Sequence, residues 1–192
     1  MLNALFSKVY NGVLTFSILF FSNYIGNSPR LSDIHVELSD TGLYLSCFLI
    51  DAFENDFDEI FDSGIKMSVI YEVEVTHNKN TIYRKDFENS VTWDFEYRQW
   101  IVHFEEENVT LYIENIEQLK RTLSFLETFI YFDSPHLLAD GISREYDKVE
   151  VKISVRLPFI YVPSIEKNMD LMVLWRLTEP TARINVYLEE NR

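Results

Sequence analysis

The chain has 192 residues, of which 47% are hydrophobic, and it carries a formal net charge of −14. This length and apolar content suffice for one domain with a buried core. So strong a negative charge repels phosphate backbones, which argues against nucleic acid as a partner. The single cysteine, Cys47, excludes an internal disulfide, and no cysteine–histidine spacing indicates a zinc site. Because Cys47 lies among apolar neighbours, we expect a buried, unreactive thiol.

Residues 1–30 differ from the rest of the sequence and predict a secretory segment. One cation, Lys8, precedes an apolar run from Val13 to Ile25. A charged start followed by a short apolar run is typical of a signal peptide, whereas a buried helix of a cytosolic protein fits this order less well. Since no good cleavage site follows, a removed signal peptide and a retained membrane anchor over residues 9–25 both stay open. We expect an exported, periplasmic chain with one domain over residues 31–192.

From Leu31 onward, apolar and polar residues alternate with a period of two, which predicts strands with one buried face. The segments with this pattern are IHVEL, IKMSVIYEVEVT, KVEVKISVRL and RINVYLE. The run LYLSCFLI, residues 43–50, is apolar on both faces and predicts a central strand.

Two segments have helical spacing instead. In residues 51–64 the apolar positions fall on one side and acids on the other, with Gly64 placed after the helix end. The second predicted helix begins at the N-cap Asn115 and runs to a stop at Asp133. The apolar faces consist of Phe53, Phe57, Ile60 and Phe61 in the first segment and of Ile116, Leu119, Leu123, Leu126 and Ile130 in the second.

The segment WDFEYRQWIVHF, residues 93–104, concentrates aromatic side chains. Its apolar positions change from odd to even numbers across Arg98 and Gln99, which requires a bulge or a tight hairpin turn there. We interpret it as two strands that pack Trp93, Trp100 and their partners into the core. The alternative is an exposed aromatic surface of Trp93, Tyr97 and Trp100 that stacks on a sugar or holds a small apolar ligand.

No motif in the sequence indicates a catalytic, cofactor or metal site. An acidic cluster in the first helical segment lacks the ligand pattern and central glycine of a calcium loop, so we interpret it as a solvated face. The histidines are scattered and accompany no nucleophile motif. Paired carboxylates of a glycoside hydrolase stay open, because the chain has 31 acidic residues. The residues concerned are Glu54, Asp56, Asp58, Glu59 and Asp62 in the cluster, and His35, His77, His103 and His136.

The order of landmarks along the chain is informative as well. They are FDSGIKMSVIYEVEV, FEYRQWIVHF, a helix with LSFLE, VEVKISVRLPFIYVP and LMVLWRLTEPTARINVYL. In this order, over most of Leu31 to Leu188, the chain resembles a family of exported bacterial proteins known only as a domain of unknown function. The family's tyrosine motif, Leu-Pro segment and late tryptophan correspond to residues 97–100, residues 157–158 and Trp175, while the larger Leu126 and Phe129 mark a divergent member. The resemblance implies no catalytic residue.

Together these patterns predict an all-β fold, an antiparallel β-sandwich of immunoglobulin-like type with two helical insertions. We expect a non-enzymatic binding or structural module outside the cytoplasmic membrane, in an envelope assembly such as a motor or secretion complex. A protein partner would bind along a sheet edge or through Phe53, Phe57 and Phe61. The alternative is a small apolar or carbohydrate ligand at the aromatic surface, and an enzyme comes third. The sequence predicts no cofactor and leaves the oligomeric state open.

Overall fold

The computed structural model describes residues 28–39, 42–54, 57–131, 148–163 and 166–187. The predicted secretory segment, including residues 9–25, lies outside these ranges apart from its last residues. Asp56, His136 and the predicted helix stop at Asp133 lie outside them as well.

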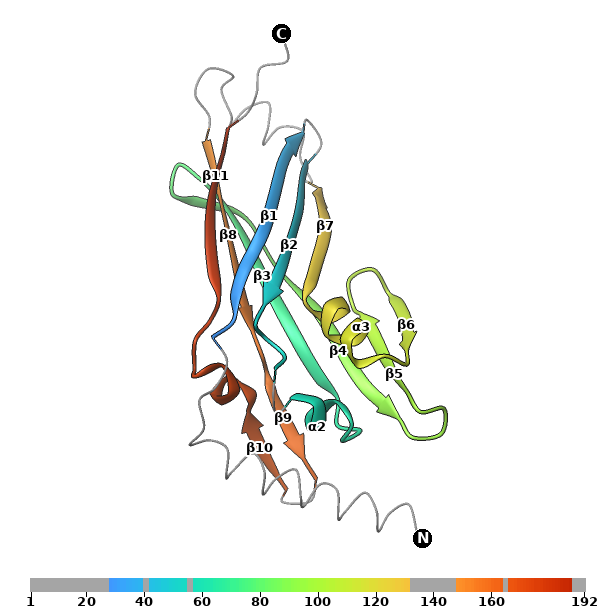
Figure 1. The fold of residues 1–192 in the computed structure, drawn as a ribbon. Helices are drawn as coiled ribbons and strands as arrows, with labels where there is room; N and C mark the ends of the chain where they lie inside the picture. The colour runs from blue at the N-terminus through green and yellow to red at the C-terminus, as the bar shows by residue number, and fades with distance from the viewer. Residues whose placement is uncertain (1–27, 40–41, 55–56, 132–147, 164–165, 188–192) are drawn as a thin grey trace.

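Two antiparallel sheets pack face to face and a short hairpin extends one end of the molecule (Figure 1). The three-stranded sheet has the order β1-β2-β7, and the six-stranded sheet has the order β11-β8-β3-β4-β5-β6. On one side of the sandwich, β1 and β11 lie next to each other. The strands are β1 (Arg30–Ser39), β2 (Gly42–Ile50), β3 (Met67–His77), β4 (Asn80–Asp94), β5 (Gln99–Phe104), β6 (Val109–Ile113), β7 (Phe125–Tyr131), β8 (Lys148–Arg156) and β11 (Thr181–Tyr187), and the hairpin consists of β9 (Phe159–Val162) and β10 (Lys167–Asp170).

The core lies between the two sheets, where alternate residues of each strand point inward. Each fully buried aliphatic side chain contributes about 1.5–3 kcal/mol relative to exposure. The sheet arrangement confirms the all-β class and the antiparallel sandwich. It also confirms that β2 is the central strand of its sheet. The immunoglobulin-like subtype stays a prediction. The inward residues include Leu43, Leu45, Cys47 and Leu49 of β2, Val69, Tyr71, Val73 and Val75 of β3, and Val149, Val151, Ile153 and Val155 of β8.

Two indole side chains tie connecting segments to the core through hydrogen bonds to backbone carbonyls. Trp175, at the end of the short 3-10 helix η1 (Leu171–Trp175), donates its Nε1 proton to the carbonyl oxygen of Ala52 at 2.9 Å. Trp100 donates its Nε1 proton to the carbonyl oxygen of Phe61 at 3.2 Å. Both bonds satisfy the polar end of a large buried ring.

The first predicted helix is present but much shorter than the spacing suggested. Helix α2 spans Phe57–Phe61, and Phe53 lies outside it although its side chain is buried. Gly64 follows with a φ of 73°, a conformation that glycine adopts without strain.

The second predicted helix was wrong in its C-terminal half. Helix α3 spans Ile116–Leu123, and β7 begins two residues later and pairs with β2. Leu126 and Ile130 are four residues apart, a spacing that fits one face of a helix and one face of a strand equally well. Aromatic and β-branched residues around them favour the strand, and both side chains are buried in it.

The segment from Trp93 to Phe104 forms a hairpin, as the change in parity required. Trp93 of β4 pairs with Trp100 of β5, and the turn occupies residues 95–98 with Arg98 at a φ of 53°. The turn begins earlier than expected, so Phe95 and Tyr97 are 61% and 68% exposed and do not join the core.

Candidate functional site

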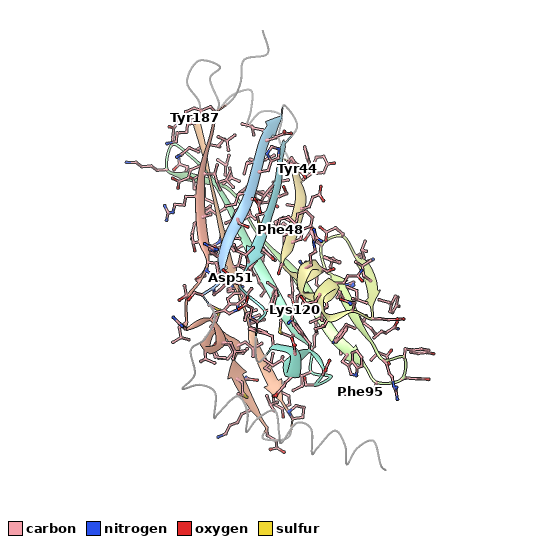
Figure 2. All side chains as sticks on the ribbon, in the orientation of Figure 1. Tyr44, Phe48, Asp51, Phe95, Lys120 and Tyr187 are labelled. Atoms are coloured by element: carbon pink, nitrogen blue, oxygen red, sulfur yellow. The ribbon has the colours of Figure 1, made fainter. Side chains whose placement is uncertain are left out.

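The outer face of the three-stranded sheet carries two groups of aromatic side chains, with the paired residues Ser46 and Glu127 between them. Residues that alternate with the buried positions of β2 and β7 point outward, and the pairing places Tyr44 opposite Phe129 and Phe48 opposite Phe125. Figure 2 labels Tyr44 and Phe48 along β2. We call this set the aromatic face; its members are Tyr44, Phe48, Phe125, Phe129 and Tyr131.

Ring contacts join two pairs of residues on the aromatic face, and part of the face is open to solvent. The ring centroids of Phe48 and Phe125 are 4.6 Å apart, and those of Phe129 and Tyr131 are 4.7 Å apart. Tyr131 is nevertheless 70% exposed and Phe129 is 37% exposed. A Cβ atom at Gly42 would lie 2.1 Å from the carbonyl oxygen of Ile130 and 2.7 Å from the Phe129 ring, so the start of β2 has no room for a side chain beside β7.

Next to the aromatic face, an open groove lies between β7 and the hairpin of β5 and β6. Its volume is about 440 Å³, and its walls are mainly apolar. The residues that line it are Phe48, Phe125 and Glu127 of the three-stranded sheet, Gln118, Arg121 and Thr122 of α3, and Phe104, Glu107, Val109 and Leu111 of the hairpin. Phe48 and Phe125 therefore belong to both the aromatic face and the groove, whereas Phe129 and Tyr131 lie beyond Glu127 on the same strand.

The groove stays open because the two sheets differ in width. Leu111 shares one side of β6 with Ile113, which is 2% exposed, and yet Leu111 is 41% exposed and Val109 is 45% exposed. The six-stranded sheet extends beyond the three-stranded sheet, and the short helix α3 covers the excess only in part. An apolar sheet surface is thus left without a covering layer among the described residues.

Two sheet edges border the groove. In the described part of the chain, β7 pairs with β2 alone and β6 pairs with β5 alone. Alternate residues of an edge strand direct their N–H and C=O groups away from the sheet, where they are available to another strand.

The electrostatic character of the groove is acidic. Glu107 and Glu127 line it against one cation, Arg121. Nearby lysines already have acidic partners: Lys66 lies 3.2 Å from Glu105, Lys120 lies 2.7 Å from Asp58, and Lys85 contacts Glu106. Tyr44 donates a hydrogen bond of 2.8 Å to Glu127, which raises the pKa of the tyrosine hydroxyl because the bond is lost on ionisation.

The residues predicted as contacts from the sequence lie elsewhere. Phe53, Phe57 and Phe61 form a buried cluster with ring centroids 5.2 Å and 5.7 Å from Phe53, so they stabilise the core and present no docking surface. The ring centroids of Trp93 and Trp100 are 4.7 Å apart. Trp100 is buried, however, and Tyr97 lies apart in the exposed turn. The structure therefore does not combine these three into one exposed platform.

The described residues of the acidic cluster and the histidines do not gather into a common site. Asp58 forms an ion pair with Lys120. The pKa of the Asp62 carboxyl is raised, mainly because the group is partly buried and also because the negative charge of Asp58 lies nearby. His35, His77 and His103 lie on β1, β3 and β5. Within the described ranges, no three residues of the types His, Cys, Asp and Glu gather as a metal site would require.

Sequence reasoning missed the aromatic face for two reasons. The run LYLSCFLI is apolar on both sides, which indicates a central strand and not an exposed face, and FLETFIY fits the spacing of a helix. In FLETFIY the alternation of Phe125, Phe129 and Tyr131 with buried Leu126 and Ile130 is the signal that would have indicated an aromatic outer face.

Comparison with models of known protein families, with curated proteins and with solved structures found no match to this chain. No helix in the described part of the chain has both the length and the apolar character needed to cross a membrane. Fold and site together define the class of molecule: an antiparallel β-sandwich with an aromatic outer face beside an open, acidic groove.

Proposed function

We propose that this protein is a non-enzymatic binding module that engages a protein partner outside the cytoplasmic membrane, as a component of an envelope assembly. The observation that carries the proposal is the mainly apolar groove, whose surface Phe48 and Phe125 extend onto the aromatic face. Exposed apolar surface of this kind, rimmed by polar residues, marks interaction sites in soluble proteins. Aromatic residues are also enriched where partners bind, since they bury a large area with few rotatable bonds.

The proposed location rests on the sequence of residues 1–30, where Lys8 precedes the apolar run from Val13 to Ile25. Either a removed signal peptide or a retained anchor would place the sandwich on the far side of the cytoplasmic membrane. The envelope assembly rests on the resemblance to exported bacterial proteins. The strong negative charge supports a protein partner over nucleic acid or an anionic membrane surface.

Site-directed photo-cross-linking of the full-length chain in its native cells tests this proposal. A photoreactive amino acid is placed at Leu111 in the groove, at Phe129 on the aromatic face, or at Phe159, a control in β9 that is 66% exposed. We expect the same protein to be attached from the first two positions and not from the third. Equal attachment from all three positions, or none from Leu111 and Phe129, contradicts the proposal.

A second candidate function is the binding of a small apolar ligand in the groove. The observation that favours it is the volume of about 440 Å³ with mainly apolar walls, because ligand pockets span roughly 300–1,000 Å³. Native mass spectrometry of the protein purified from its own cells tests this function. A bound small molecule that disappears in Leu111→Trp, whose larger side chain fills the groove, supports ligand binding; a mass equal to that of the chain alone argues against it.

A further inference from the structure

We propose that the partner binds as an extended, cationic segment that adds a fourth strand to the three-stranded sheet along the edge of β7, with alternate apolar side chains in the groove. This inference rests on the proposed function, and it specifies the chemistry and the conformation of the partner. Three features of the described residues support it: the edge, the shape of the groove and the charge.

The edge of β7 offers a backbone template. Strand β7 has seven residues, so an added strand of that length would extend about 23 Å at ~3.3–3.4 Å per residue. Its partner β2 occupies one edge, and no described strand occupies the other. Backbone hydrogen bonds along such an edge give affinity that does not depend on the sequence of the added strand.

The groove lies where the side chains of an added strand would point. Phe125 and Glu127, from the first half of β7, form one wall, and Val109 and Leu111 of β6 form the facing wall. A strand laid along β7 therefore has alternate side chains in contact with both walls and with α3. Apolar residues at these positions would cover the part of the wider sheet that α3 leaves exposed.

Charge selects among the occupants that this shape admits. The groove is lined by two carboxylates, Glu107 and Glu127, and by one guanidinium, Arg121. A further exposed acid, Glu114, lies in the short connection from β6 to α3. On a chain with a formal net charge of −14, this arrangement favours lysine or arginine in the partner. A second copy of this chain carries the same negative charge, which disfavours it as the occupant.

The test uses the full-length protein in detergent and fluorescently labelled nine-residue peptides, with fluorescence anisotropy as the readout. The probe alternates lysine and valine, and its matched control alternates glutamate and valine. We expect the lysine peptide to bind at least tenfold more tightly than the glutamate peptide, and its affinity to fall as salt rises. Equal affinities for the two peptides overturn the assignment of charge.

Two further peptides test the added strand. Each alternates lysine and valine, and each carries N-methyl groups at every second residue, in one of the two registers. Because an added strand pairs only every second N–H with an edge, one of the two should bind like the parent while the other loses at least tenfold in affinity. If both bind like the parent, or both lose affinity alike, edge pairing is wrong.

Variants locate the binding site. Leu111→Asp should weaken binding of the lysine peptide at least tenfold, because it places a carboxylate against the apolar side chains of the added strand. The matched control Leu177→Asp lies at an exposed position outside the groove and should bind as the unmodified protein does. Equal affinities of the two variants overturn the location.

The photo-cross-linking experiment distinguishes this inference from the proposed function. Attachment of one cellular protein from Leu111, together with failure of every peptide prediction, would leave the proposed function standing and reject the extended strand. Absence of that attachment rejects both.

Discussion

The hydroxyl of Tyr71, in the middle of β3, donates a hydrogen bond of 2.8 Å to the carbonyl oxygen of Leu123, the last residue of α3. The side chain of Tyr71 is fully buried, so the bond joins the six-stranded sheet to the helix that forms one wall of the groove. It supplies a hydrogen-bond acceptor for a hydroxyl that would otherwise be buried without one.

Tyr71→Phe should therefore lower the free energy of unfolding by about 1–3 kcal/mol, because the carbonyl of Leu123 is left without its donor in a buried position. Urea unfolding of the two proteins measures the difference. The control Tyr161→Phe removes a hydroxyl from a side chain that is 54% exposed and should change stability by less than about 0.5 kcal/mol. Equal losses in both variants would show that the bond to Leu123 has no special contribution.

Gly64 has a second constraint besides its φ of 73°, because a Cβ atom there would lie 2.4 Å from the ring of Phe95. Phe95 lies in an exposed turn, so its ring can move aside, whereas the backbone conformation cannot change without moving α2. We expect Gly64→Ala to lower the free energy of unfolding by about 1 kcal/mol or more. The cost should be nearly the same in a Phe95→Ala background, as thermal or urea unfolding of all four proteins would measure. Relief of most of the cost in that background would mean that the ring contact dominates.

Much of the fold could be predicted because strands with one buried face have a strict period of two. The strand over residues 67–77 and that over residues 148–156 follow from this alternation alone. The helix end was not predictable in the same way, since Leu119, Leu123, Leu126 and Ile130 are all buried and their spacing does not distinguish a helix from a helix followed by a strand. Pairing with β2 decides the outcome, and contact between segments 83 residues apart, such as the hydrogen bond from Tyr44 to Glu127, leaves no local signal.

The candidate site was harder to predict than the fold. Aromatic clusters in the sequence pointed to Phe53, Phe57 and Phe61 and to the segment around Trp93, but large aromatic side chains are most often used to fill a core. The exposed aromatic residues come from β2 and β7, which are brought together only by sheet pairing. The groove depends in addition on the unequal widths of the two sheets, which no single segment encodes.

Asn115 holds the N-terminus of α3, as its side-chain Oδ1 accepts a hydrogen bond of 3.0 Å from the backbone N–H of Gln118. This part of the sequence prediction is confirmed. Asn115→Ala should lower the free energy of unfolding by about 1 kcal/mol, and Asn115→Asp should retain most of the stability because aspartate caps equally well. Chemical denaturation of both variants provides the measurement. The control Asn168→Ala, at an exposed position of β10, should have little effect. A loss as large in Asn115→Asp as in Asn115→Ala would exclude capping as the cause.

Burial raises the pKa of the Cys47 thiol from 9.0 to about 12, because the thiolate would lie in the apolar core. Below pH 9 the folded and unfolded chains both keep the proton, so the thiol adds no pH dependence to stability. Between pH 9 and pH 12 the unfolded chain releases a proton that the folded chain retains, and the free energy of unfolding should fall by up to about 1.4 kcal/mol per pH unit.

Cys47→Ala should be less stable than the unmodified protein at pH 7, because a buried side chain is shortened. The difference in the free energy of unfolding between the two proteins should narrow as pH rises above 9, because the variant lacks the thiol whose ionisation destabilises the unmodified protein. Urea unfolding between pH 8 and pH 10 is the suitable measurement. Burial also raises the pKa of Tyr71 well above 10.0, so at higher pH this tyrosine ionises in the unfolded chain and lowers the stability of both proteins. A constant gap across this range would mean that the thiol ionises as readily in the core as in water.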